Sequence, residues 1–547
     1  MAQLEEVAFP KLSAAEIALV KPLAKEELYS DGDIIFRAGQ DEIDCFIVQS
    51  GEIEIRNPAD GDRVVVMHGP GQFSGDIDLL TGRPVLVSAI SRGRTSVLRV
   101  PHSHLRPLLN RVPSFGEKLI IALTRRRELL NQMGTIGLRV LGPGRCRDTN
   151  TVREFLYKNF VPFTWFDPET DEGQRLFKQF GSPKKTPAIQ CSDGQVLLNP
   201  SLQQLASAAG IWRHCPSQEV DFAIIGAGPA GIAAAVYASS EGLSTLMLDR
   251  LGPGGQAGGS SRIENFIGFP AGLSGADLAT RGVLQMLKFG ARIVAPVCVN
   301  KLRPAETSGD CHRLLLDCGA EIRCRVVLLA IGVRWRQLEA AGAERFAGAG
   351  IYYACTTVEA DLYDRTDVAV VGAGNSAGQA VMFLAECCPT RTVHLLIRRS
   401  LGAGMSEYLS QRVRACPNVV IHEQTEIDSV YGNRHIEEIE LKNSADKSRR
   451  RVACSAVFVF IGAEPAADWL PPQIARDKNG YLLTGTDVVR SGLWPLTDRD
   501  PCPLETTIPG VLAAGDVRSG STKRVGFAVG DGSLSVTCAH RLLSIHR

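Results

Sequence analysis

Two glycine-rich turns of the same kind occur in this chain, and each separates a short apolar run from an Ala-rich stretch. The first is Gly226-Ala-Gly-Pro-Ala-Gly231 and the second is Gly372-Ala-Gly-Asn-Ser-Ala-Gly378. We expect strands at 220–225 and 367–371 before them and helices after them. In this context the glycines let the backbone approach a pyrophosphate, which the N–H groups at the helix start can hold. The chain is therefore predicted to contain two doubly wound dinucleotide-binding domains.

The charge that follows the next strand differs between the two turns. Asp249 follows the apolar run 244–248, and a carboxylate there accepts hydrogen bonds from a ribose diol. Arg398 and Arg399 follow the run 393–397, and their guanidinium groups attract a 2′-phosphate. This contrast predicts FAD at the first turn and NADPH, rather than NADH, at the second.

The length and charge of the chain limit the remaining possibilities. At 547 residues it is too long for one core, so three or four domains are expected. Its net charge of +1 gives no field for nucleic acid or a membrane surface. There is no apolar run of membrane-spanning length, and the acidic start is not a signal peptide, so a cytoplasmic protein is expected. The 15 cysteines show neither a disulfide framework nor metal-ligand spacing, and no metal site is predicted.

From about residue 220 onwards the sequence resembles the low-molecular-weight thioredoxin reductases. Three stretches carry most of this resemblance: Gly254-Gly-Gln-Ala-Gly258, Ile263-Glu-Asn-Phe-Ile-Gly-Phe-Pro270 and Ile508-Pro-Gly-Val-Leu-Ala-Ala-Gly-Asp516. The resemblance implies an FAD domain split into residues 217–336 and 464–547, with an NAD(P)H domain, residues 337–463, inserted between the two pieces. It also implies hinges near 334–336 and 462–463, on which one domain rotates to bring nicotinamide to flavin N5.

The turns and the resemblance together give a set of expected cofactor-binding residues. For FAD they are Gly226, Gly228, Ala230, Asp249, Gly255, Gln256, Asn265, Gly515, Asp516, Lys523, Arg524 and Val525. For NADPH they are Gly372, Gly374, Asn375, Ser376, Arg398 and Arg399. The resemblance implies that Asp516 holds the ribityl chain of FAD. It also implies that a helix starting within residues 523–532 presents its N-terminal dipole to the flavin pyrimidine ring.

Three positions depart from the pattern of these reductases. The thioredoxin reductases carry a Cys-x-x-Cys just before the second Rossmann strand. This chain has Cys355-Thr-Thr-Val358 there, so only the first cysteine is present. A single thiol cannot form an intramolecular disulfide, which would interrupt the relay from flavin to dithiol. Cys355 is either a monothiol or a coincidental cysteine. The segment Ala330-Ile-Gly332 has isoleucine where the reductases have a threonine, so the threonine hydroxyl is missing. Ala403 stands where the reductases have a further arginine.

Residues 9–132 contain short β runs divided by glycine turns, followed by two helical stretches. With the turn glycines Gly32, Gly39 and Gly51 they resemble cyclic-nucleotide-binding domains of the catabolite-activator type, which implies a β jelly-roll barrel. In that family a cassette of glycine-glutamate and proline-arginine binds the cyclic nucleotide. Here the corresponding cassette spans residues 73–89, and Gly75 and Asp76 are its candidate ligand residues.

Val85 stands where the phosphate-binding arginine of that cassette is expected, and Arg83 lies two residues early. Losing a charge-assisted contact to phosphate costs about 2–3 kcal/mol. Two interpretations of the barrel stay open: it binds an altered nucleotide ligand, or it is structural or dimerising.

Residues 135–216 follow the order β-α-β-α-β-β-α, which resembles glutaredoxins and thioredoxins. Thr186-Pro187 matches their cis-proline position, and Cys146-Arg-Asp-Thr149 matches their active site with one cysteine instead of two. Cys146, next to Arg145 and Arg147 at a helix start, is either a monothiol or part of a redox-dead adaptor.

The chain is therefore expected to be a multidomain protein: a β-barrel, an α/β thioredoxin-like domain and two α/β Rossmann-like domains. The leading hypothesis is an FAD-dependent NADPH oxidoreductase that passes electrons to a small-molecule or protein acceptor. The alternatives are a thioredoxin-disulfide reductase that uses Cys355 or Cys146 with external thiols, and a ligand-sensing flavoprotein with little turnover. A homodimer is expected, because both resembled families usually dimerise.

Overall fold

A computed structural model describes residues 7–58, 61–133, 137–191, 193–211, 218–307, 309–402 and 404–545. The acidic start and the predicted boundaries at 135, 216 and 217 lie outside these residues. The chain forms two compact units. One comprises Met1–Pro143, Val152–Cys215 and Val283–Pro296, and the other comprises Gly144–Thr151, Pro216–Gly282 and Val297–Arg547. No helix in the described part of the chain is both long and apolar enough to cross a membrane.

The first part of the chain is an antiparallel β structure followed by two helices. Its strands lie in the order β1-β5-β3-β4, with β2 also paired to β5. Its elements are α2 (Ala14–Val20), β1 (Lys25–Tyr29), β2 (Ile34–Phe36), β3 (Cys45–Asn57), β4 (Arg63–His68), α3 (Asp78–Thr81), β5 (Ser88–Val100), α4 (His102–Arg111) and α5 (Pro113–Met133). The expected turn glycine Gly51 lies within one long strand, β3, where the pairing with β5 shifts its register. A Cβ at Gly51, which has φ +77°, would lie 2.6 Å from Thr95 Oγ1.

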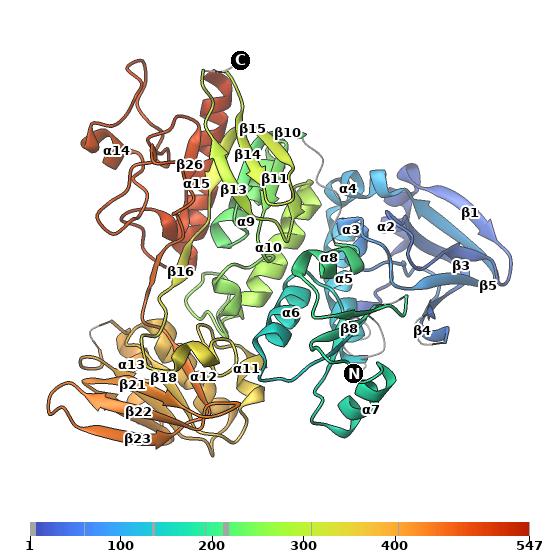
Figure 1. Cartoon of the computed structure of the whole chain (residues 1–547). Coiled ribbons are helices and arrows are strands. Elements are labelled where there is room, and N and C mark those ends of the chain that lie inside the picture. Colours follow the sequence, from blue (N-terminus) through green and yellow to red (C-terminus); the bar gives the residue numbers. More distant parts are fainter. Residues whose placement is uncertain are drawn as a thin grey trace. The chain divides into compact units, whose positions relative to one another are not determined.

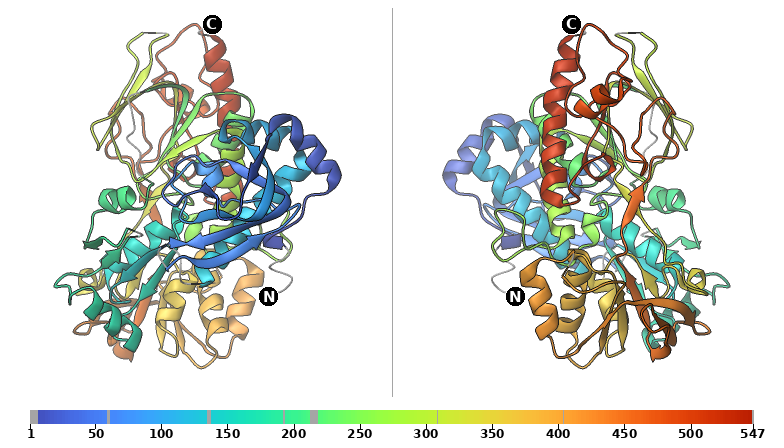
Figure 2. Two further views of the ribbon diagram at one scale, coloured as in Figure 1. Left: turned by 90° about the vertical axis from the view of Figure 1, so that its right-hand side faces the viewer. Right: turned by 90° about the vertical axis from the view of Figure 1, so that its left-hand side faces the viewer.

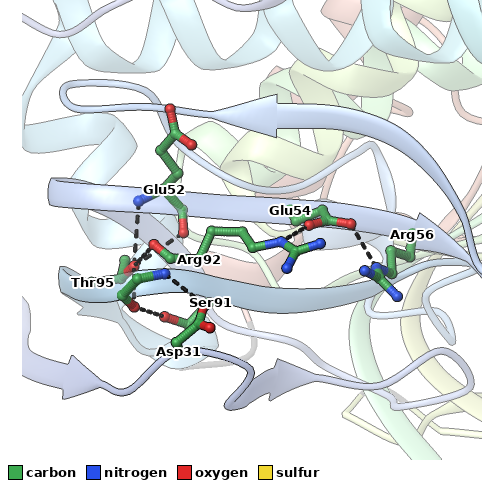
Figure 3. A network of polar contacts seen from close by, with 8 residues as sticks. Asp31, Glu52, Glu54, Arg56, Ser91, Arg92 and Thr95 are labelled. Carbon is green, nitrogen blue, oxygen red and sulfur yellow. Dashed lines mark hydrogen bonds and ion pairs between the residues drawn. The ribbon is translucent and has the colours of Figure 1, made fainter.

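A polar network joins the two longest strands of this β structure (Figure 3). The Glu54 side chain on β3 is only 2% exposed and lies between two arginines. Arg56 Nε donates to Glu54 Oε1 at 2.7 Å, and Arg92 Nε on β5 donates to Glu54 Oε2. The Arg92 hydrogen bond, opposed by burial and reinforced by Arg56, lowers the pKa of Glu54. The buried carboxylate is therefore ionised and paired at neutral pH.

The next segment forms a four-stranded sheet in the order β7-β6-β8-β9. β6 and β7 are parallel, whereas β8 runs antiparallel to β6 and to β9. Its elements are β6 (Leu138–Leu141), α6 (Arg147–Lys158), β7 (Phe163–Phe166), α7 (Asp171–Gln179), β8 (Ala188–Gln190), β9 (Val196–Leu198) and α8 (Leu202–Ala208). The Thr186–Pro187 peptide bond is cis, as the sequence resemblance implied.

The first dinucleotide-type domain is built from two separate stretches of chain. β10 lies between β11 and β15, and all three are parallel. β26 comes from the far end of the sequence and pairs in parallel with β15, which joins the two stretches. The elements are β10 (Gln218–Ile225), α9 (Pro229–Ser240), β11 (Thr245–Leu248), α10 (Gly275–Phe289), β12 (Arg292–Val294), β13 (Val299–Arg303), β14 (His312–Leu316), β15 (Glu321–Leu329), α14 (Thr486–Ser491), β26 (Val511–Ala513) and α15 (Val525–Ile545). Figure 2 shows α15 as one long, uninterrupted helix.

The inserted domain has a parallel sheet in the order β17-β24-β18-β19-β20. It also has an antiparallel sheet in the order β21-β22-β23, whose strands are labelled in Figure 1. Its three central parallel strands, β18, β19 and β24, are fully buried and almost entirely apolar, as expected for strands covered on both faces, whereas the edge strand β20 is partly exposed. The elements are β17 (Ile351–Tyr352), α11 (Thr357–Leu362), β18 (Val368–Val371), α12 (Asn375–Cys387), β19 (Val393–Ile397), α13 (Glu407–Ala415), β20 (Val419–Glu423), β21 (Thr425–Tyr431), β22 (Glu438–Asn443), β23 (Arg449–Ala453) and β24 (Ala456–Val459).

The two linkers that join the inserted domain to its host pair with each other. β16 (Val333–Trp335) and β25 (Ala463–Pro465) form a two-stranded antiparallel ladder. Arg334 Nε lies 2.6 Å from Glu464 Oε1, and Arg334 Nη1 lies 2.9 Å from Asp468 Oδ2. The predicted hinge segments therefore lie side by side.

Candidate functional site

The first glycine turn leaves the start of α9 open to a ligand. A Cβ at Gly226, which has φ +105°, would lie 2.4 Å from the Ala330 carbonyl oxygen, and one at Gly231 would lie 2.0 Å from the Gly226 carbonyl oxygen. Only glycine fits this close packing of strand, turn and helix. Gly228, by contrast, has open space where a Cβ would be, apart from Gly255 Cα at 3.9 Å. No side chain caps α9, so its first N–H groups are available to a pyrophosphate, and the turn fits that group.

The Asp249 carboxylate binds the backbone of the first turn and of the loop that follows β11. Its carboxylate accepts hydrogen bonds from the backbone N–H groups of Ala227 at 2.8 Å, Leu251 at 2.9 Å and Gly252 at 2.8 Å. A carboxylate has about four acceptor positions. One position therefore remains for a ribose hydroxyl. The sequence alone predicted the ribose contact but not the backbone contacts.

The second predicted FAD segment packs directly on the first turn. The Gly254 N–H donates to the Ala227 carbonyl oxygen at 2.8 Å. A Cβ at Gly255, which has φ +54°, would lie 2.8 Å from Gly228 Cα. The Gln256 side-chain amide donates to the Val333 carbonyl oxygen. Asn265 is exposed, and no hydrogen bond of its side chain to another described residue is present.

The C-terminal stretch brings Gly515 and Asp516 to the same helix start. A Cβ at Gly515 would lie 3.2 Å from Ala230 Cβ, and one at Gly532 would lie 2.2 Å from the Ala230 carbonyl oxygen. Burial raises the pKa of Asp516, and Lys523 opposes this shift. No described residue donates a hydrogen bond to the Asp516 carboxylate, so it is free to accept one from a ligand hydroxyl. These residues fit a ribityl chain next to a pyrophosphate.

Two residues that the sequence analysis did not assign hold this stretch in place. Asp531 accepts from the Gly515 N–H at 3.0 Å and from Arg518 at 3.1 and 3.2 Å. Lys523 Nζ donates to Tyr481 Oη at 2.8 Å and to the Asp516 carbonyl oxygen at 3.4 Å. Asp531 lies within the stretch 523–532 and was identifiable from it, whereas Tyr481 is 42 residues from Lys523 and gave no signal. α15 begins at Val525, immediately after Arg524.

The second glycine turn repeats the geometry of the first. A Cβ at Gly372, which has φ +145°, would lie 2.4 Å from the Phe460 carbonyl oxygen, whereas at Gly374 the nearest atom would be 4.0 Å away. No side chain caps α12. Asn375 Oδ1 accepts from the Ser406 N–H at 2.7 Å, so this side chain orders the neighbouring loop, and Ser376 is exposed.

Arg398 and Arg399 lie at the edge of the sheet to which the second turn belongs. β18 and β19 are parallel, with Val371 opposite Leu396, so their carboxyl ends meet at one edge. Both arginines are exposed, and neither has an ion-pair partner among the described residues. Their guanidinium groups fit a phosphate ester. Ala403, where a further arginine was expected, lies outside the described residues.

The two candidate thiols have different surroundings. Cys355 is 3% exposed and packs in the core of the inserted domain. Burial, with Glu359 nearby, raises the pKa of Cys355 well above the ordinary thiol value, which disfavours the reactive thiolate. Cys146 is partly exposed and immediately precedes α6.

The segment that carries Cys146 contacts the inserted domain within one compact unit. The Arg145 guanidinium lies 5.0 Å from the centre of the Tyr363 ring. Asn150 Nδ2 donates to the Gly348 carbonyl oxygen at 3.1 Å. Residues 144–151 therefore belong with the reductase part.

Gly75 and Asp76, the candidate ligand residues of the cassette, lie just before the short helix α3. Gly75 has φ +117°, and a Cβ there would lie 2.0 Å from Leu79 Cδ1. Asp76 forms an ion pair with Arg127 of α5 at 2.8 Å. Val85 is 4% exposed and exchanges backbone hydrogen bonds with the loop at Gly39 and Gln40. No cluster of His, Cys, Asp and Glu in the described ranges is suited to a metal ion.

Two family models match separate regions of the chain. Residues 220–532 match the family model described as pyridine nucleotide-disulphide oxidoreductase, and residues 26–112 match the cyclic nucleotide-binding domain. The second match lies within the antiparallel β structure of the first part of the chain.

Among curated relatives, the thioredoxin reductase of Mycoplasma pneumoniae is 31% identical over 58% of this chain and 93% of its own length. The 34.2 kDa protein in the rubredoxin operon of Clostridium pasteurianum is 30% identical over 60% of this chain and 98% of its own length. The crystal structure of Lactococcus lactis thioredoxin reductase matches with a TM-score of 0.52 and 24% identity, over 60% of this chain and 99% of that one, which shows the same fold. The chain belongs to the pyridine nucleotide-disulphide oxidoreductase family and is a thioredoxin reductase-like oxidoreductase with a cyclic nucleotide-binding domain ahead of the reductase part.

Proposed function

We propose that this chain is an NADPH-oxidising flavoenzyme that delivers electrons to an acceptor other than an internal dithiol. The observation that carries this proposal is the convergence of the open start of α9, Gly255 and Asp516, which together fit FAD. The family as a whole uses FAD and NAD(P)H, and bound flavin supplies the capacity to accept a hydride. Arg398 and Arg399 favour NADPH over NADH because each offers an exposed cation at the carboxyl edge of the second sheet.

The residues at the dithiol position favour an acceptor that needs no protein disulfide. Val358 replaces the second cysteine in α11, and the remaining Cys355 is buried with a raised pKa. A thiol of this kind is a poor nucleophile and cannot close a disulfide with a valine. Direct transfer from the reduced cofactor to a quinone, oxygen or another small acceptor is therefore the mechanism that the residues support.

Anaerobic mixing of the purified protein with NADPH tests this proposal. We expect the flavin absorbance to bleach within seconds and to return when a quinone is added. An aromatic disulfide should be reduced far more slowly than the quinone. Slow or absent bleaching would instead support a ligand-sensing flavoprotein with little turnover.

A second candidate function is a thioredoxin-disulfide reductase that uses Cys146 as a monothiol. It is favoured by the contacts of Arg145 and Asn150 with the inserted domain, since they hold this partly exposed thiol on the reductase part. Rapid reduction of the aromatic disulfide by the wild-type chain, lost in C146S, would favour this function over the first.

We also propose the finer architecture that the sequence predicted. The β7-β6-β8-β9 order, with one parallel and two antiparallel pairs, supports a thioredoxin-like domain over residues 135–216. The antiparallel sheet of residues 25–100 supports a jelly-roll barrel within 9–132. The proposed FAD domain comprises 217–336 and 464–547, and the NADPH domain comprises 337–463. We propose a homodimer because both resembled families usually dimerise, and measuring the molecular mass by light scattering tests it.

A further inference from the structure

The acidic group of the barrel cassette is already paired within the chain. Arg127 of α5 lies 2.8 Å from Asp76 Oδ2 and 3.0 Å from Asp78 Oδ2, and all three side chains are at most 15% exposed. Arg127 Nε also donates to Asp76 Oδ1 at 3.2 Å. A ligand hydroxyl that needs the Asp76 carboxylate must therefore compete with a buried guanidinium.

The neighbouring buried arginine, Arg126, uses all three of its guanidinium nitrogens in hydrogen bonds to the chain. Arg126 donates to the carbonyl oxygens of Ala8 at 2.8 Å, Gly75 at 2.6 Å and Phe73 at 2.9 Å. Its guanidinium also lies over the rings of Phe9 and Phe73. Because Val85 supplies no charge, these contacts leave no buried cation available for a cyclic phosphate among the described cassette residues.

Arg127 of α5 and Arg83 of the cassette also bind the two residues that follow α6. Arg127 Nη1 donates to the Phe160 carbonyl oxygen at 2.9 Å, and Arg83 Nη1 donates to the Asn159 carbonyl oxygen. Phe160 has φ +57°, a left-handed conformation that is unfavourable for a bulky residue and needs support from its surroundings. The two arginines supply that support by fixing the carbonyl groups on both residues.

We propose that the cassette is a docking site for the chain's own residues 159–160, joined through Arg127, and that a nucleotide at the cassette and this docking exclude each other. One guanidinium satisfies Asp76, Asp78 and Phe160 together. Removing Asp76 from it would leave a buried charge incompletely paired, which is unfavourable. By linkage, a ligand that binds by drawing Asp76 away from Arg127 weakens the docking of residues 159–160 by the same factor by which this docking weakens the ligand.

Hydrogen exchange on the whole protein tests this docking. In R127M and in the milder R83M, exchange of the amides of residues 159–161 should rise at least about tenfold, since a charge-assisted contact is lost. R92M is the matched control, because Arg92 serves the same barrel through Glu54 and does not contact residues 159–160. Equal exchange in R127M and wild type, or the same rise in R92M, would overturn the proposal.

Calorimetry with cyclic AMP and cyclic GMP tests the exclusion. The wild-type chain should give no binding heat. If a nucleotide does bind, it should raise the exchange of the amides of residues 159–161 as R127M does. Binding that leaves this exchange unchanged would show that ligand and docking coexist, and would sink the exclusion.

Discussion

At the scale of single residues, the placing of charge distinguishes binding groups from structural ones. Arg398 and Arg399 are exposed and unpaired among the described residues, whereas Glu54 is buried between Arg56 and Arg92. An exposed, unpaired cation contributes little to stability and is available to a ligand. A buried, paired carboxylate contributes to stability and is not available.

Replacing both Arg398 and Arg399 by alanine should raise the KM for NADPH about 10- to 100-fold, because charge-assisted contacts to a phosphate ester are lost. The KM for NADH should change little, since NADH lacks that phosphate. Steady-state kinetics with an artificial acceptor measure both values. R365A is the control, because the Arg365 side chain is 85% exposed and lies in the same domain. An unchanged preference between the two nucleotides would refute the assignment.

E54Q should lower the free energy of unfolding by about 1–3 kcal/mol at neutral pH. The folded-state pKa of Glu54 is lowered from its ordinary value of 4.5, so the ion pairs contribute fully above that value. Their contribution is lost as the pH falls through the lowered pKa. Urea unfolding at about pH 7 and about pH 4 should therefore show a smaller difference between wild type and E54Q in acid. A difference that grew in acid would contradict the ion pairs.

At the scale of elements, close backbone packing shapes the first dinucleotide site. G255A should reduce the flavin content of the purified protein, because its Cβ would lie 2.8 Å from Gly228 Cα and its φ is +54°. The ratio of flavin to protein absorbance measures this content. G258A is the control, since a Cβ there has nothing within 4 Å. Equal flavin content in the two variants would mean that this packing does not shape the site.

Local patterns predicted most elements of the fold. The apolar run 393–397 matches β19 to the residue, and the strands expected at 220–225 and 367–371 are β10 and β18, because apolar runs before glycine turns identify buried strands. β1 (Lys25–Tyr29) was missed, because its sequence Lys-Glu-Glu-Leu-Tyr is mostly polar and exposed and lacks apolar alternation. The pairing of Arg127 with Asp76 spans 51 residues, and no local pattern reveals such a contact.

At the scale of the whole molecule, the question is where the electrons go. C355S should keep flavin reduction and quinone turnover within about twofold of wild type, because a buried thiol with a raised pKa is a poor nucleophile. Stopped-flow absorbance and NADPH consumption measure the two steps. Intact flavin reduction with abolished acceptor turnover in C355S would show instead that this thiol carries the electrons.

The pairing of the two interdomain linkers has a mechanical consequence. Because β16 and β25 share one antiparallel ladder and the Arg334–Glu464 ion pair, the two linkers form a single two-stranded ribbon. A rotation of the inserted domain would therefore have to twist or bend both strands together. A one-residue insertion in either linker would turn the side chains of that strand to the opposite face of the ribbon, and would thereby disturb the pairing of the two linkers.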